Sequence, residues 1–298
     1  MMEIPYPVLL AGIFVLGGLS GGLSNVTSGG AGVFTIYFMT NYAGLAIQDS
    51  TGTVLAASTV IVLIGAFSFY RMKQVNMRLA ITVGLSGVAG AFLVARWAST
   101  IGGSSLEQAF GGFTLALACY TSYIFINEWR KQKAQNTLAP DVTSVITNTN
   151  RRGIGSKTLL PQYDIQSPGI SSGWSGTSAA ALTVQIAIGL LVGVATGIFG
   201  VGLASLSILL FILLFKLDVR VALGTSLLAS FCRYAGGSIG YLTASQFDLL
   251  MFGILVFGGG IGSIVGSKMM IGNRNRSRDI YVKLLQVALL IFISYEFL

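Results

Sequence analysis

The chain has 298 residues, of which 53% are hydrophobic and only 9% are charged. Soluble domains carry about 25% charged residues, so this composition excludes a soluble globular fold. Several apolar runs reach the length that crosses a bilayer as a helix, and they are continuous instead of alternating, which excludes a β-barrel. The fold class that we expect is therefore an all-α polytopic membrane protein. The net charge of +8 comes mostly from basic residues in short loops, so we expect no nucleic-acid partner.

Ten apolar segments are predicted, in two sets of five on either side of a polar stretch. The segments are roughly 5–24, 31–47, 51–70, 77–97 and 105–127, followed by 178–197, 203–217, 221–243, 247–270 and 279–297. The polar stretch is rich in Ser, Thr, Asn and Gly and predicts a flexible cytoplasmic linker. We therefore expect a first membrane repeat over 1–127, a linker over 128–177 and a second membrane repeat over 178–298. The N-terminus lacks the basic region of a cleavable signal peptide, so we expect it to be retained.

The two halves resemble each other in sequence. A shift of 172 positions aligns residues 17–96 with 189–268 without a gap and gives 15 identities in 80 positions, seven of them glycine. The identities include a Gly-Thr pair in each half, Gly52–Thr53 and Gly224–Thr225. The absence of gaps over this length indicates an internal repeat.

The basic residues predict that the two halves have opposite orientations. In the first half the basic loop follows the third segment, whereas in the second half the loops on either side of the equivalent position are basic. One alternating path through the membrane places 16 of the 18 basic residues on the cytoplasmic side, all except Arg96 and Arg233. Both termini then lie outside. Inverted repeats of this kind are typical of secondary transporters, whose substrate site lies near the midplane between the halves.

Glycine-rich stretches interrupt the first helix pair of each half, at 21–32 and at 193–202. Open backbone at membrane depth is tolerated only where it is buried in protein or lines a cavity, and the helix that restarts after each break favours an anion at its N-terminus. Each pair either spans the membrane twice or returns as a broken re-entrant hairpin. The glycines serve either close helix packing or a ligand. The candidate substrate-binding residues in these stretches are Asn25, Thr27, Ser28, Gly30, Gly200 and Gly202.

The Gly-Thr pairs and one arginine complete the candidate set. Thr53, and Thr225 with Ser226, begin the following helices, where their hydroxyls either cap the helix or donate to an oxyanion. Arg233 is the only charge well inside an apolar segment, and its repeat counterpart is Ile61. An intramembrane arginine is a functional-site hypothesis by default, and no acidic residue lies at a comparable depth. Its partner is therefore either a bound anion or backbone carbonyl groups at the glycine breaks.

The glycine-rich first helix pair, the following Gly-Thr-Ser, the repeated halves and the linker resemble the TauE/SafE family of sulfite and organosulfonate exporters. The resemblance covers residues 17–127 and 183–297, and the chain departs from the family pattern at 25–28, where the pattern has glycines. It implies transport of sulfite, thiosulfate, sulfoacetate or a related sulfonate. The residues alone indicate only an anion.

We therefore expect a secondary transporter, an exporter of a small sulfur-containing anion, in the inner cell membrane. The alternative is an anion channel. We expect no enzyme activity, no cofactor and no metal site, because the chain has no histidine and no buried acidic cluster. It also lacks the Gly-rich loop with Lys-Ser or Lys-Thr that holds nucleotide phosphates, so a gradient must drive transport. The expected partners are the anionic substrate and the lipid bilayer, with a homodimer left open.

Overall fold

The computed structural model describes residues 6–27, 31–116, 118–119, 122–123, 126, 179–200, 204–271, 291 and 295. Among these, only the backbone is described for residues 6, 24–27, 31, 180, 204–205 and 269–271. The predicted linker over 128–177 lies outside the described residues, and so does most of the predicted last segment, 279–297.

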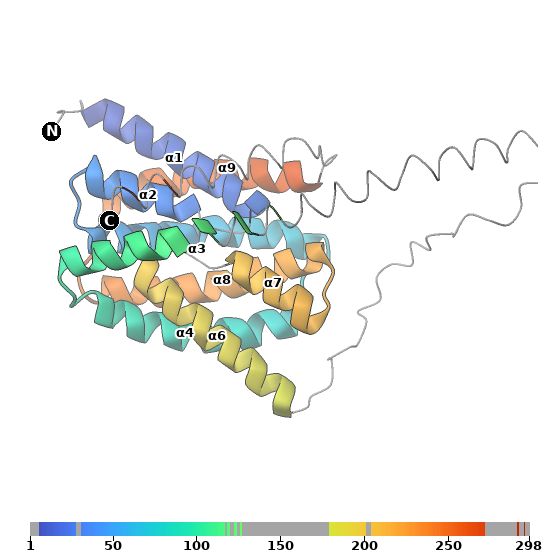
Figure 1. Cartoon of the computed structure of the whole chain (residues 1–298). Coiled ribbons are helices and arrows are strands. Elements are labelled where there is room, and N and C mark those ends of the chain that lie inside the picture. The colour runs from blue at the N-terminus through green and yellow to red at the C-terminus, as the bar shows by residue number, and fades with distance from the viewer. Residues whose placement is uncertain are drawn as a thin grey trace, which may run out of the picture.

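The described part of the chain is all helical (Figure 1). The first half contributes α1 (Tyr6–Thr27), α2 (Ala31–Asn41), α3 (Ile47–Arg71) and α4 (Met77–Ala98), followed by a helix over 103–116. The second half contributes α6 (Ala179–Phe199), α7 (Ala204–Phe215), α8 (Val219–Leu242) and α9 (Leu249–Ile271). Within the described residues, α3, α4, α6 and α9 are long and apolar enough to cross a membrane. The predicted fold class is confirmed.

The repeat is visible in the turns as well as in the helices. The loop from α3 to α4 and the loop from α8 to α9 each contain a non-glycine residue with positive φ, 57° at Lys73 and 59° at Ser245. These two residues are equivalent under the shift of 172. The helices that follow begin at equivalent caps, where the Oδ1 atoms of Asn76 and Asp248 accept from the backbone N–H three residues on, at 3.2 and 2.9 Å. The two equivalent loops therefore share the positive φ value and the cap of the helix that follows.

The two halves are inverted, because the equivalent helices α3 and α8 lie against each other and run antiparallel. At one end of the pair, a Cβ atom on Gly52 of α3 would lie 2.8 Å from the Cβ atom of Tyr241, near the end of α8. At the other end, a Cβ atom on Gly224 would lie 3.0 Å from the Cβ atom of Phe69. The loop over 72–76 and the loop over 243–248 are consequently at opposite ends of the bundle.

Glycines hold two further helix pairs in close parallel contact, α1 with α9 and α4 with α6. A Cβ atom on Gly193 of α6 would overlap the carbonyl oxygen of Gly87 on α4, and one on Gly197 would lie 2.6 Å from the carbonyl oxygen of Ala91. In the other pair, Gly21 lies in the same way against Gly259. Small residues spaced four apart let membrane helices approach to backbone contact. Gly21, Gly193 and Gly197 thus serve helix packing, one of the two roles predicted for the glycines of the interrupted pairs.

The helices α2 and α7 are only half as long as a membrane span. They have 11 and 12 residues, or about 17 and 18 Å at the usual rise per residue, against a hydrocarbon layer of about 30 Å. Each interrupted pair therefore joins a long helix to a half-length one, as a broken hairpin requires. The helix over 103–116 lies beside the second break, because Phe113 stacks on Phe199 at the end of α6 with ring centroids 3.7 Å apart.

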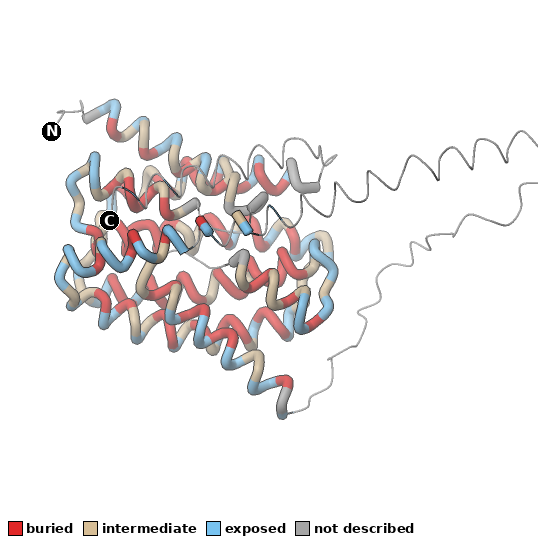
Figure 2. The backbone as a smooth tube through the Cα atoms, in the orientation of Figure 1, coloured by how far each residue is buried: buried red, intermediate tan, exposed pale blue. Residues whose placement is uncertain are grey.

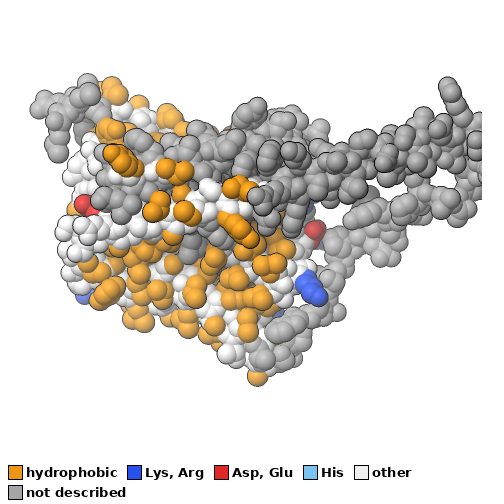
Figure 3. Space-filling model, in the orientation of Figure 1, with side chains coloured by type: hydrophobic (Ala, Val, Ile, Leu, Met, Phe, Trp, Pro, Cys, Tyr) orange, Lys and Arg blue, Asp and Glu red, His pale blue; other side chains and the backbone are white. Residues whose placement is uncertain are grey.

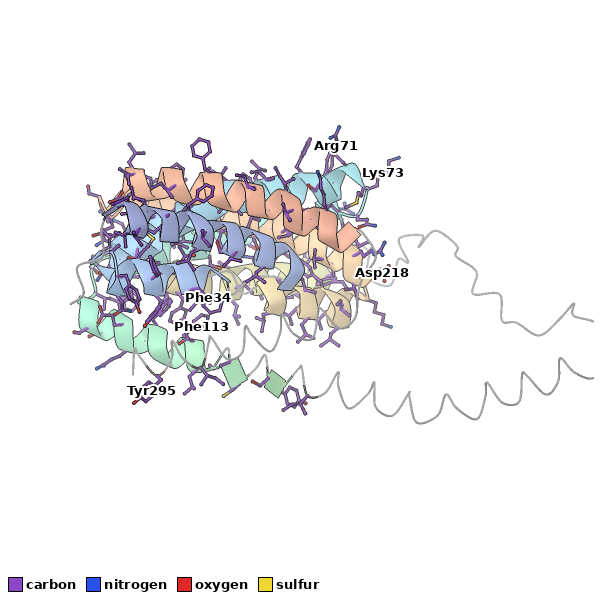
Figure 4. All side chains as sticks on the ribbon, turned by 90° about the horizontal axis from the view of Figure 1, so that it is seen from above. Phe34, Arg71, Lys73, Phe113, Asp218 and Tyr295 are labelled. Atoms are coloured by element: carbon purple, nitrogen blue, oxygen red, sulfur yellow. The ribbon has the colours of Figure 1, made fainter. Side chains whose placement is uncertain are left out.

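The side surface of the bundle is apolar, and its charges gather at the ends. Buried residues concentrate on the inner helices (Figure 2), while exposed Leu, Ile, Val and Phe side chains cover the flank (Figure 3). Most of the described basic residues share one end, at the α3–α4 and α7–α8 loops and the end of α9; they are Arg71, Lys73, Arg78, Lys216, Arg220 and Lys268. Figure 4 shows Arg71 and Lys73 at the same end as Asp218, the N-cap residue of α8. This distribution is that of a multi-pass membrane protein.

Cysteine labelling tests the inversion directly. In a background without Cys119 and Cys232, a cysteine at Arg71 and one at the equivalent residue Thr243 should react with a membrane-impermeant maleimide from opposite sides of the membrane. Both positions are exposed at helix ends. Labelling of both from the same side would contradict the antiparallel arrangement of α3 and α8.

Substitution of Gly193 tests the close packing of α4 and α6. Gly193→Ala forces a methyl group into the backbone of Gly87, so we expect destabilisation of about 1–3 kcal/mol, measured as a lower melting temperature in detergent. The matched control is Gly253→Ala in α9, where a Cβ atom would meet open space. Since alanine favours a helix by about 1 kcal/mol over glycine, the control should melt no lower than the wild type.

Candidate anion-binding site

Arg233 lies at the middle of the α3–α8 contact. It is nine residues after Gly224 and eight before Tyr241, the two positions at which α8 meets the ends of α3. At the helical rise this places its Cα atom about 12–14 Å from either end of the contact. The side chain is 0% exposed. A buried guanidinium at mid-depth must be compensated by hydrogen bonds or by an opposite charge.

Two serine hydroxyls supply part of that compensation. The Nη2 atom of Arg233 donates to the Oγ atom of Ser230 at 2.7 Å and to the Oγ atom of Ser207 at 3.3 Å. Ser230 lies one turn earlier on α8, and Ser207 lies in the first turn of α7. The guanidinium has N–H donors on all three nitrogens, and the Nε and Nη1 atoms have no hydrogen-bond partner among the described residues. The arginine is therefore incompletely satisfied.

A glycine on α4 makes room for the arginine. A Cβ atom on Gly87 would lie 2.5 Å from the Cγ atom and 2.7 Å from the Cδ atom of Arg233. In the other half the equivalent glycine, Gly259, holds Ile61 in the same way. Each half therefore has an equivalent slot, the space beside Gly87 or Gly259 that the missing Cβ atom leaves for a side chain of the α3–α8 pair. The slot beside Gly87 holds the charged Arg233, and the slot beside Gly259 holds the apolar Ile61.

The electrostatic environment of Arg233 favours an anion. The guanidinium reaches the first turn of α7, where the helix dipole places partial positive charge. The described carboxylates lie in loops or near helix N-termini, away from the midpoint of α8; they are Asp49, Glu107, Asp218 and Asp248. An anion at this point would pair with both the guanidinium and the helix N-terminus.

Tyr241 fixes the end of α6, where the second interrupted pair breaks. Its hydroxyl is within hydrogen-bond distance of the carbonyl oxygens of Gly197 at 3.2 Å and Ile198 at 3.4 Å, which the helix leaves without an intrahelical donor. Gly200 follows with φ of +63°, a left-handed conformation that glycine adopts without steric cost. The equivalent of Tyr241 in the first half is Phe69, so this contact exists on one side only.

The Gly-Thr pairs lie at the two ends of the α3–α8 contact. The Oγ1 atom of Thr53 accepts from the backbone N–H of Asp248 at 3.0 Å, and that of Thr225 accepts from the backbone N–H of Asn76 at 3.0 Å. Each hydroxyl thus binds the loop of the opposite half. Ser226 donates to the carbonyl oxygen of Leu223 at 2.9 Å. These contacts neither bring the two pairs together nor join them to Arg233, and a substrate-binding role for them stays a prediction.

The remaining predicted site residues are described in part or not at all. Asn25 and Thr27 end α1 with only their backbone described, while Ser28, Gly30 and Gly202 lie outside the described residues. Gly200 is placed against Thr51 of α3 and Ile36 of α2. The role of these residues in binding stays a prediction.

Sequence reasoning missed three residues of this region: Ser207, Ser230 and Tyr241. Ser230 is identical to its repeat counterpart, Ser58, and Ser207 aligns with a second hydroxyl residue, Thr35. A hydroxyl residue at the same position of both repeats was therefore the sequence pattern that could have identified Ser207 and Ser230 as site residues. No sequence pattern pointed to Tyr241, because its contact depends on where α6 ends.

The inverted halves, the half-length helices and the buried arginine between them define a polytopic membrane transporter. The chain belongs to the sulfite exporter TauE/SafE family, whose sequence model matches residues 8–296. It is similar to the probable membrane transporter protein YdhB of Bacillus subtilis (strain 168), with 26% identity over 247 residues, which cover 83% of this chain and 84% of that protein. No solved structure gives a significant match.

Valine substitution tests the contacts that the threonines make between the halves. Thr225→Val removes the acceptor for the N–H of Asn76, so we expect a loss of about 1 kcal/mol of stability. Thr53→Val should cost about the same, since its contact is equivalent. The control is Thr59→Val, whose hydroxyl donates only within its own helix. Equal melting temperatures for all three variants would show that these contacts between the halves carry no stability.

Proposed function

We propose that this transporter exports a small sulfur-containing anion such as sulfite, thiosulfate or an organosulfonate. The observation that carries the proposal is Arg233, which is buried at mid-depth with Nε and Nη1 unpartnered among the described residues and no described carboxylate beside it. An arginine in this state lacks a counter-charge, and a substrate anion would provide one. The family to which the chain belongs supports the choice of a sulfur oxyanion.

The chemistry of the donors suits a sulfonate or sulfite group. Such a group spreads its charge over several oxygens, each of which accepts hydrogen bonds. The free N–H groups of Arg233 form charge-assisted hydrogen bonds, which are shorter and stronger than neutral ones. The N-terminal N–H groups of α7 add neutral donors from a second direction. Ser207 and Ser230 keep the guanidinium in place, so that little side-chain entropy is lost when the anion binds.

The driving force that we propose is the membrane potential. With the basic end of the bundle in the cytoplasm, as the positive-inside rule requires, the linker is cytoplasmic and both termini lie outside. An inside-negative potential then expels an anion with about 2.3 kcal/mol per charge per ~100 mV. Movement of one inverted half against the other exposes the site to each side in turn.

The experiment that tests the substrate class is a thermal-shift screen of the purified protein, followed by flux measurements. The ligands are sulfite, thiosulfate, sulfoacetate, taurine, phosphate and sulfate. We expect stabilisation by sulfite or a sulfonate, and saturable uptake of the same anion into proteoliposomes. Stabilisation by phosphate alone, or by none of the six, would contradict the proposal.

Substitution of Arg233 tests the site itself. Arg233→Leu removes the buried charge together with its desolvation cost, so the protein without ligand should melt no lower than the wild type. Stabilisation by the anion should disappear and transport should fall at least about tenfold, the loss of about 1.4 kcal/mol. Arg233→Lys keeps the charge but not the geometry of the guanidinium, and should bind more weakly than the wild type.

The matched control is Arg220→Leu, which removes an exposed arginine from the basic end of the same helix. It should leave binding unchanged. If Arg233→Leu unfolds the protein while the surviving molecules transport normally, the arginine is structural and the proposed site is wrong.

A further inference from the structure

The helix equivalent to α7 in the first half carries a buried hydroxyl without a partner. This helix is α2, and its Thr35 aligns with Ser207 under the shift of 172. The side chain of Thr35 is 2% exposed, and its Oγ1 atom has no hydrogen-bond partner in the part of the chain that the structure describes. A buried hydroxyl left without a partner costs about 1–3 kcal/mol. Its retention at this place therefore calls for a physical reason.

The missing partner follows from the difference between the two repeats. Ser207 accepts a hydrogen bond from Arg233, whereas the residue equivalent to Arg233 in the first half is Ile61. Isoleucine offers no hydrogen bond, so the hydroxyl of Thr35 is left over. The N-terminus of α2 also presents N–H groups without intrahelical acceptors. Because helix side chains tilt toward the N-terminus, Thr35 points toward those groups.

The end of α6 lies beside α2. Gly200 follows the last residue of α6 and lies four residues before α7 begins. It packs against the residue next to Thr35, because a Cβ atom on Gly200 would lie 3.2 Å from the Cδ1 atom of Ile36. The break that leads into α7, whose first turn binds Arg233 through Ser207, therefore lies beside the helix that carries Thr35.

We propose that the first turns of α2 form a second, uncharged part of the binding site, in which Thr35 holds a neutral oxygen of the same substrate. The proposal rests on the proposed function, because it assumes that the anionic group binds at Arg233. A hydroxyl group both donates and accepts, and the helix N-terminus donates, so the complementary group is an alcohol or carbonyl oxygen. With isoleucine in place of arginine there is no charge for a second anionic group. The favoured substrate is therefore an organic sulfonate with a hydroxyl or carbonyl group on a short carbon chain.

The test compares two sulfonates that differ by one hydroxyl group, ethanesulfonate and 2-hydroxyethanesulfonate. Binding to purified wild-type protein and to Thr35→Val is measured by calorimetry. We expect the wild type to bind the hydroxylated compound about fivefold more tightly, the equivalent of one hydrogen bond of about 1 kcal/mol. Thr35→Val should lose this preference while its affinity for ethanesulfonate stays within about twofold. Thr35→Ser should keep the preference, and the control Thr59→Val should behave as the wild type.

The melting temperature of the protein without ligand checks the premise. Valine has nearly the shape of threonine, and the hydroxyl that it removes has no described partner, so Thr35→Val should melt no lower than the wild type. A clear drop, rescued by Thr35→Ser, would show that the fold uses the hydroxyl and would overturn the inference.

The remaining outcomes separate the two proposals. If the wild type binds both sulfonates equally through Arg233, or if Thr35→Val keeps the preference, the second part of the site is wrong and the proposed function stands. If neither sulfonate binds to the wild type, the proposed function fails for organosulfonates, and this inference fails with it.

Discussion

The antiparallel contact between α3 and α8 is the constraint on which the rest of the structure depends. The two ends of the contact are built in the same way. At each end a glycine, Gly52 or Gly224, lets the opposite helix approach, and the threonine that follows it accepts a hydrogen bond from the loop of the opposite half. Because the contact has two equivalent ends, its midpoint is defined, and Arg233 lies there. The depth of the candidate site in the membrane is thus a consequence of how the two halves pack.

The function that we propose arises from a departure from this symmetry. The two halves build equivalent slots beside Gly87 and Gly259, but one slot holds Arg233 and the other holds Ile61. A symmetric pair of arginines would repel each other at mid-depth, whereas a single one attracts a single anion. The Tyr241 contact with the end of α6 has no equivalent either, since Phe69 has no hydroxyl. The second half is therefore specialised for charge, whereas the first half has hydroxyl residues at the equivalent positions, Thr35 and Ser58, without the arginine.

Much of the fold could be predicted from the sequence, because it depends on patterns that are local or periodic. Apolar length predicts helices that cross the membrane, and the gapless repeat with alternating basic loops predicts the inversion that the antiparallel α3 and α8 confirm. The candidate site was predictable only in part. Arg233 stood out because charge is costly in a membrane, but the Gly-Thr pairs were equally compatible with ligand binding and with packing.

The amino-acid sequence by itself determined the class of protein, the two inverted halves and the single charge well inside an apolar segment. The class and the cost of that charge follow from the free energy of placing side chains in lipid, and the inversion follows from the gapless repeat and the positions of the basic loops. Only the tertiary structure decided which partners those side chains meet. It set Ser207 and Ser230 against Arg233, gave each threonine of the Gly-Thr pairs a loop of the opposite half, and left Thr35 without a described partner. Most of these contacts join residues far apart along the chain, and their geometry depends on how closely glycines let the helices approach.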